Sequence, residues 1–138
     1  MPEKKKAAFD KDVRYPRSRI EKLGVKPGAR VAVLGVEDAA FLEELKAQGA
    51  VASARVKGGL DLVFVGMTAT SDLPRLEKLR EAVRPAGAVW VIWPKGRREF
   101  REDDIRGFGP QAGLVDVKVM AFSDTLSALK MVIPLRER

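Results

Sequence analysis

LDLVFVG at residues 60–66 and AVWVIWPK at residues 88–95 are two apolar runs, joined by the amphipathic segment TATSDLPRLEKLREAVRPAG at residues 68–87. Runs as apolar as these are typical of strands that are buried on both faces. The joining segment predicts a helix that ends at Pro85 and Gly87, because leucine and valine recur in it at helical spacing. Strands joined by a helix run parallel with a right-handed crossover, so the sequence predicts an α/β fold. The expected apolar face of the helix comprises Leu73, Leu76, Leu79 and Val83.

The composition of the chain excludes several kinds of site. Without cysteine there is no disulfide, thiol nucleophile or thiolate metal site, and without histidine the usual zinc site and the commonest general base are missing. Charged residues make up 33% of the chain and asparagine is absent, which is typical of thermophilic proteins. A length of 138 residues suits one domain, and the absence of a long apolar run or a secretion signal predicts a cytoplasmic protein.

The positive charge of the chain is concentrated near its N-terminus. Residues 1–30 contain ten Lys or Arg against four Asp or Glu, whereas the remainder contains sixteen against fifteen. We therefore divide the chain into a basic arm with a short helix, residues 1–25, and an α/β domain, residues 26–138. A solvated tail is the simpler interpretation of the arm, and nucleic-acid binding through phosphate neutralisation is the alternative. The side chains that would contact phosphates are Lys4, Lys5, Lys6, Lys11, Arg14, Arg17 and Arg19.

A strand, a glycine and a helix open the α/β domain. RVAVL at residues 30–34 predicts a strand that ends at Gly35, and the following helix is expected to bury Phe41, Leu42 and Leu45. VASARV at residues 51–56 is a further strand candidate, but only three residues separate it from the strand at residue 60. Three residues span about 10 Å and cannot return along a six-residue parallel strand. This segment must be short, frayed or antiparallel, and one strand-helix repeat of a larger doubly wound domain is missing.

The C-terminal part of the chain predicts a polar helix and a hairpin. Gly107, Gly109 and Pro110 are expected to break the helix at residues 102–112. LVDVKVMAF and LSALKMVIP, separated by a three-residue turn, predict two antiparallel strands. Lys130 lies in the middle of the second strand, where we favour protection of an exposed edge over a functional role; an exposed edge would also allow pairing into a homo-oligomer. The first strand is expected to place Val115, Val117, Val119 and Ala121 on one face.

The order of these elements resembles a class I S-adenosylmethionine-dependent methyltransferase domain over residues 26–134. The resemblance rests on the strand-Gly-helix opening, on RPAG at residues 84–87 before a buried strand, and on the closing hairpin. The chain resembles more closely a small bacterial family, a domain of unknown function, through KLGVKPG at residues 22–28, WPK at residues 93–95 and SALK at residues 127–130. Both resemblances imply a Rossmann-like, mostly parallel sheet.

The cofactor motifs that the methyltransferase resemblance implies are not retained. In such enzymes the first strand ends in an acidic residue before a Gly-x-Gly-x-Gly loop, and the second strand ends in an acidic residue that binds the ribose hydroxyls. Here the first acidic position is Val33, and Gly35 is followed by Glu37 and Ala39 where glycine is expected. The segment ASARVKGG after the second strand carries basic residues instead. We therefore expect a degenerate cofactor site.

A binding site in an open parallel sheet lies outside the carboxyl ends of the strands. There Trp93 would stack on a small anionic or aromatic ligand and Lys95 would supply a positive charge, although core packing and a solvated loop are the simpler interpretations. The expected set contains no catalytic triad, metal-binding motif or phosphate loop. Its members are Gly35, Glu37, Gly66, Met67, Thr68, Trp93 and Lys95.

The functional expectation is a non-catalytic, methyltransferase-like domain that binds a small ligand or a protein and requires no cofactor. A divergent S-adenosylmethionine-dependent methyltransferase is the first alternative. A nucleic-acid-binding protein that uses the basic arm is the second.

Overall fold

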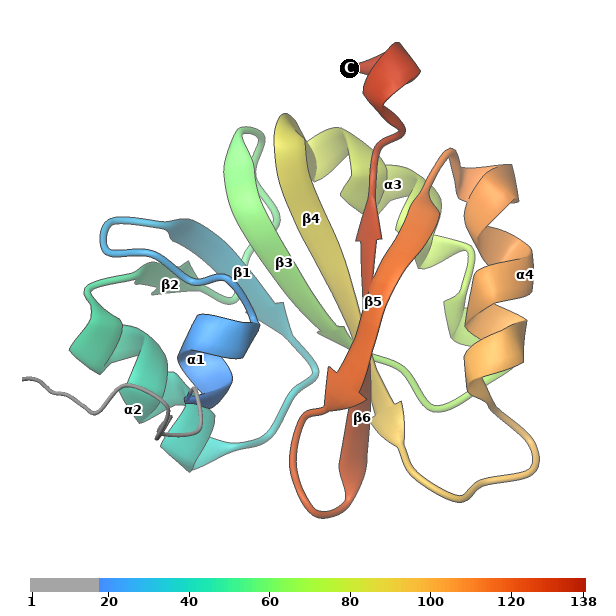
Figure 1. Ribbon diagram of the computed structural model, residues 1–138, viewed down its shortest axis with the longest axis horizontal. Coiled ribbons are helices and arrows are strands. Elements are labelled where there is room, and N and C mark those ends of the chain that lie inside the picture. The colour runs from blue at the N-terminus through green and yellow to red at the C-terminus, as the bar shows by residue number, and fades with distance from the viewer. Residues whose placement is uncertain (1–17) are drawn as a thin grey trace, which may run out of the picture.

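The computed structural model describes residues 18–138, whose six strands form one sheet in the order β2-β1-β3-β4-β6-β5 (Figure 1). Strands β2, β1, β3 and β4 are parallel, whereas β6 is antiparallel to both β4 and β5. The strands are β1 (Arg30–Leu34), β2 (Val51–Ser53), β3 (Leu60–Gly66), β4 (Val83–Pro94), β5 (Val115–Ala121) and β6 (Leu126–Val132). The α-helices are α1 (Arg19–Lys22), α2 (Ala39–Gln48), α3 (Arg75–Ala82) and α4 (Glu102–Ala112), and the 3-10 helices are η1 (Thr70–Asp72) and η2 (Leu135–Glu137).

Helices cover both faces of the sheet and create a three-layer structure with two cores (Figure 1). Alternate residues of each buried strand enter opposite cores, because successive side chains of a strand point to opposite faces. The α/β, Rossmann-like sheet with a C-terminal antiparallel hairpin is thus confirmed. The first core packs Ile20, Leu23, Phe41 and Leu45 of α1 and α2 and the residues around them on Leu62, Phe64 and Trp90. The second packs Leu76, Leu79 and Ile105 of α3 and α4 on Val63, Val65, Val91 and Leu129.

Helix α1 is part of this packed domain. Ser18 caps it, and Ile20 and Leu23 are 5% and 0% exposed. The indole Nε1 of Trp90 donates a hydrogen bond to the carbonyl oxygen of Leu23 at 3.1 Å, which fixes the end of α1 to the sheet. A boundary at residue 25 therefore does not separate two packing units among the described residues.

The strand-helix-strand unit at the centre of the sheet is confirmed, but its helix is shorter than expected. Helix α3 begins at Arg75, after η1, and the side chain of Asp72 accepts hydrogen bonds from the backbone N–H groups of Thr68 and Ala69. Val83 was expected on the helix and is instead the first residue of β4, where it pairs with the start of β3. Strand β4 thus continues through the Pro and Gly that were expected only to end the helix.

Strand β2 is short, which is one of the three outcomes that chain reach allowed. It contains three residues and pairs in parallel with β1, from Arg30 opposite Val51 to Ala32 opposite Ser53. Six residues, 54–59, then lead to β3 on the other side of β1. Six residues reach about 20 Å, which is enough to return along a strand of about 10 Å.

Two expectations for the helices are wrong. Leu42 was expected in the core but is 45% exposed, because the buried side of α2 carries Phe41 and Leu45. The C-terminal helix is continuous: Pro110 lies within α4, and Gly109 is buried. A Cβ at Gly109 would come within 2.6 Å of the Met131 side chain, so this glycine allows close packing of α4 on the sheet.

The C-terminal hairpin contains a β-bulge that the alternating sequence conceals. Asp116 pairs with Met131 and Lys118 pairs with Lys130, so Val117 is the extra residue. The expectation that all four alternating residues share one face is wrong, since the bulge shifts the alternation between Val115 and Val119. Strand β6 also lies between β4 and β5, so Lys130 does not protect an exposed edge.

No helix among residues 18–138 is long and apolar enough to cross a membrane.

Candidate functional site

A cleft of about 430 Å³ lies at the carboxyl ends of β1, β3 and β4. Five of the expected site residues line it: Gly35, Glu37, Gly66, Met67 and Thr68. Its remaining walls are mainly apolar, and they are formed by Val36, Ile92, Pro94 and Leu126.

The base of this cleft is formed by two glycines from neighbouring strands. Gly35 has a φ of +68°, a conformation that side chains disfavour, and it turns the chain from β1 toward α2. A Cβ at Gly66 would overlap with the carbonyl oxygen of Gly35. The ends of β1 and β3 therefore approach closely, and the backbone of the two glycines lines the cleft at this point.

Two expected site residues, Trp93 and Lys95, lie elsewhere. Ile92 faces the cleft, so the next residue of β4, Trp93, points to the opposite face and is 5% exposed in the second core. Trp93 and Lys95 line a separate cavity of about 440 Å³ together with Arg97, Arg98 and Arg101. Trp93 therefore does not line the cleft beside Gly35, where it was expected to contact a ligand.

The first turn of α2 is fixed by a charged network that includes Asp38 and Arg19. Asp38 caps α2 by accepting a hydrogen bond from the backbone N–H of Phe41 at 2.9 Å. Arg19 donates to Asp38 at 2.9 Å, to both carboxylate oxygens of Glu44 at 2.9 and 2.7 Å, and to the carbonyl oxygen of Phe122 at 3.0 Å. Arg19 also lies over the rings of Phe41 and Phe122. These residues join α1, α2 and the β5–β6 hairpin.

The charges of this network are stabilised by their neighbours. The pKa of Arg19 is raised above its ordinary value, mainly by the hydrogen bonds to Glu44. Burial of Asp38 opposes its ionisation, but the Phe41 N–H and the Arg19 guanidinium together outweigh burial, so the pKa of Asp38 lies below its ordinary value of 3.8. Arg19, expected to contact nucleic acid, is instead used within the fold. The other residues of that expectation, Lys4, Lys5, Lys6, Lys11, Arg14 and Arg17, lie outside the described residues, and nucleic-acid binding stays a prediction.

The described residues between the ends of β1 and β2 lack the acidic side chain that the methyltransferase resemblance implies for binding a ribose. A further cavity of about 230 Å³ lies between the ends of β1 and β2, where the ribose acid is expected. Of the described residues lining it, Ser53 alone has a polar side chain, so no carboxylate is present to accept from ribose hydroxyls. The backbone N–H groups of Thr68 and Ala69 are already bonded to Asp72. The described residues also contain no cluster of acidic side chains that would hold a metal ion.

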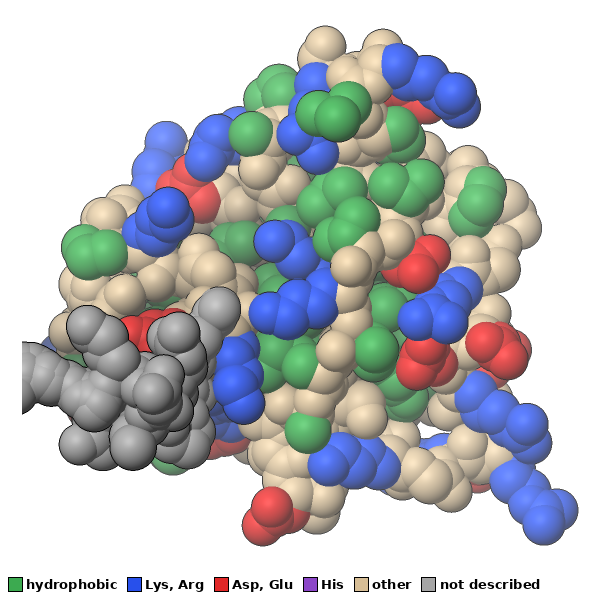
Figure 2. Space-filling view, in the orientation of Figure 1, with side chains coloured by type: hydrophobic (Ala, Val, Ile, Leu, Met, Phe, Trp, Pro, Cys, Tyr) green, Lys and Arg blue, Asp and Glu red, His purple; other side chains and the backbone are tan. Residues whose placement is uncertain are grey.

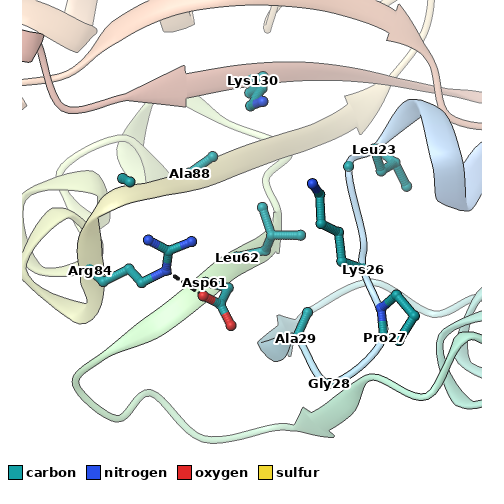
Figure 3. A pocket seen from close by; sticks show the side chains of 12 residues that line it. Leu23, Lys26, Pro27, Gly28, Ala29, Asp61, Leu62, Arg84, Ala88 and Lys130 are labelled. Atoms are coloured by element: carbon teal, nitrogen blue, oxygen red, sulfur yellow. Dashed lines mark hydrogen bonds and ion pairs between the residues drawn. The ribbon is translucent and has the colours of Figure 1, made fainter.

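A cavity of about 370 Å³ at the opposite, amino-terminal edge of the sheet was missed by sequence reasoning (Figure 3). Its charged side chains are Lys26 from the turn before β1, Asp61 of β3, Arg84 of β4 and Lys130 of β6. The one available signal was Lys130, a lysine in the middle of an apolar strand. Lys26 and Arg84 gave no signal, because only the folded chain brings these distant residues together.

The solved structures similar to this chain include S-adenosylmethionine-dependent methyltransferases. A SAM-dependent methyltransferase from Aquifex aeolicus matches with a TM-score of 0.63 and 15% identity, over 83% of this chain and 87% of that one. Ribosomal protein L11 methylase from Lactobacillus delbrueckii subsp. bulgaricus matches with a TM-score of 0.63 and 15% identity, over 83% and 74%. Magnesium protoporphyrin IX methyltransferase from Synechocystis PCC 6803, with bound SAH, matches with a TM-score of 0.56 and 11% identity, over 83% and 78%.

No family model and no curated protein matches the sequence. The structural likeness confirms the methyltransferase-like fold, and at this identity it concerns the fold alone.

Proposed function

We propose that the protein is a non-catalytic binding module that uses a methyltransferase fold. The observation that carries this proposal is the pairing of an open cleft with an unsuitable donor set. The cleft keeps the position that ligands take in open parallel sheets. The ends of β1 and β2 provide apolar side chains and one serine where a ribose needs a carboxylate.

The lining of the cleft favours a small neutral or cationic ligand with an apolar body. Val36, Met67 and Ile92 provide apolar contact area, while Thr68 provides a hydroxyl. Glu37 is the one ionisable side chain among the described lining residues, so the cleft is unfavourable for anions.

The test of this proposal is a thermal-shift series with S-adenosylmethionine, its demethylated product and common nucleosides, combined with an assay for methyl transfer. A ligand at 100 times its dissociation constant adds about 2.7 kcal/mol to the free energy of unfolding. The expected result is no saturable stabilisation by S-adenosylmethionine and no methyl transfer. Stabilisation together with methyl transfer to any acceptor would overturn the non-catalytic proposal and establish the divergent methyltransferase.

A fragment screen by NMR tests the binding role of the cleft. Neutral or cationic fragments are expected to shift the amide signals of Gly35 and Thr68, and Leu126→Trp should abolish these shifts by filling the cleft. The matched control is Val117→Trp, because Val117 is 55% exposed on β5 and does not line the cleft. Shifts that persist in Leu126→Trp would place the binding outside the cleft.

A further inference from the structure

Lys130 occupies an unusual position for a lysine. It is half-buried in an interior strand, with β4 on one side and β5 on the other. Its register partners are Trp90 of β4 and Lys118 of β5, so two lysines face each other directly across a strand pair. Like charges in this arrangement destabilise a sheet, and such local conflicts are expected at functional sites.

The two lysines differ in their surroundings. The ammonium group of Lys118 donates a hydrogen bond to the carbonyl oxygen of Lys22 at the end of α1, at 2.8 Å. Within residues 18–138, neither Lys130 nor Lys26 forms a salt bridge or a side-chain hydrogen bond. Figure 2 shows basic side chains gathered near the middle of the visible face, beside hydrophobic side chains.

The cavity on this face is bordered by positive groups from three sides. Lys26 extends into it, and Lys130 lies on β6, beyond Ala88 of β4 (Figure 3). Arg84 forms an ion pair with Asp61 through Nε, while its terminal nitrogens turn toward the cavity (Figure 3). Asp61 is the single acid among the described lining residues, and its second oxygen accepts from the backbone N–H of Arg30 at 2.8 Å. The lining therefore has an excess of two positive charges.

The floor of the cavity is apolar. Leu62 and Ala88 are register partners on β3 and β4, and the small side chain of Ala88 leaves space above the sheet. Leu23, Pro27 and Ala29 form the wall on the side of α1. A volume of about 370 Å³ is within the usual range for small-molecule sites.

We propose that this amino-edge cavity binds a small organic phosphate monoester, whose dianionic group lies between Lys26, Arg84 and Lys130 and whose apolar body lies on Leu62 and Ala88. Two excess positive charges match a dianion, and the apolar floor favours an organic ester over inorganic phosphate. The site is on the opposite edge of the sheet from the carboxyl-end cleft, so the two proposals stand or fall separately.

The experiment is an NMR titration of the full chain with phenyl phosphate and with inorganic phosphate, at low ionic strength and against a sodium chloride control. Phenyl phosphate is expected to cause saturable shifts of the amide signals of Lys26, Leu62, Ala88 and Lys130. Inorganic phosphate should shift the same signals with weaker affinity, because it makes no contact with the apolar floor.

Charge-removing variants locate the site. Lys130→Gln and Lys26→Gln should each weaken phenyl phosphate binding about tenfold, since each removes a charged contact. Lys78→Gln is the matched control, because Lys78 is exposed on α3, on the other face of the sheet, and its loss should leave the affinity unchanged. If Lys130→Gln fails to fold, Lys26→Gln decides alone, since Lys26 is exposed on a turn.

Three results would overturn the proposal. They are the absence of saturable shifts with either probe, saturable shifts confined to Gly35 and Thr68 at the other edge, and equal loss of affinity in the Lys78 and Lys26 variants.

Discussion

The carbonyl oxygen of Gly35 lies where a Cβ of residue 66 would have to be. Gly35 directly follows β1 and Gly66 is the last residue of β3, and the two glycines allow these parallel strands to approach at the carboxyl edge of the sheet. The carboxyl-end cleft is built on this contact. Its shape therefore depends on the absence of two side chains rather than on the presence of a catalytic group.

Gly66→Ala is predicted to destabilise the protein by about 1–3 kcal/mol, because the added methyl group forces the two strand ends apart. Gly107→Ala is the matched control: a Cβ at Gly107 meets no atom within 4 Å, and alanine favours a helix interior by about 1 kcal/mol. Denaturant unfolding measures both changes. Equal stability of the two variants would show that the Gly35–Gly66 contact is not tight.

Asp38→Asn is predicted to reduce the acid sensitivity of the fold. The pKa of Asp38 is lowered in the folded state, so its stabilising contribution is complete above its unfolded value of 3.8 and is lost as the pH falls through the lowered folded value. The denaturant concentration at the wild-type unfolding midpoint should therefore fall when the pH is lowered below about 4. It should fall more steeply than the midpoint of Asp38→Asn.

The Asp38 variant should retain part of the loss of stability at low pH, because the pKa of Asp61 is also lowered in the folded state. The backbone N–H of Arg30, followed by Arg84, lowers its pKa against the effect of burial. Asp124→Asn serves as the control, because Asp124 is exposed in the hairpin turn. If Asp38→Asn loses stability at low pH as steeply as the wild type does, Asp38 is not a source of the acid sensitivity.

Trp90→Phe is predicted to cost about 1–3 kcal/mol beyond its packing loss, because it leaves the buried carbonyl oxygen of Leu23 without its donor. Trp93→Phe is the comparison, since Trp93 is also buried but makes no such hydrogen bond within the described part of the chain. Urea unfolding, followed by circular dichroism, measures the difference. If the two variants lose equal stability, the Trp90–Leu23 bond does not fix α1.

Nucleic-acid binding by the basic arm predicts a gel shift that weakens with salt and disappears when the arm is removed. The deletion should end at residue 17, because removal of residues 1–22 would also remove Arg19 and Ile20, which hold α1 in the fold. A gel shift that survives removal of residues 1–17 would count against the arm.

The fold was predictable because its signals are local and repeated. Two apolar runs with a helical period between them predicted β3, α3 and β4, and the three residues between 56 and 60 limited the strand before them to a short, frayed or antiparallel one. Val117 shows the limit of such signals, since alternation in the sequence does not reveal which residue a bulge leaves unpaired.

The candidate site was predictable only in part. Five residues next to strand ends do line one cleft, because parallel strands end at the same edge. Trp93 was misplaced although the period of a strand already assigns it and Ile92 to opposite faces. The basic cavity was missed because Lys26, Arg84 and Lys130 come from distant parts of the chain and meet only in the folded sheet.

Isothermal titration of the full chain with S-adenosylhomocysteine tests whether the methyltransferase fold retains a cofactor site. Product binding needs no methyl acceptor, so the measurement reports the cofactor site alone. No saturable heat is expected, in the wild type and in Glu37→Gln alike, because the described residues at the ends of β1 and β2 provide no carboxylate for the ribose. Saturable one-to-one binding that Leu126→Trp abolishes and Val117→Trp preserves would contradict this expectation.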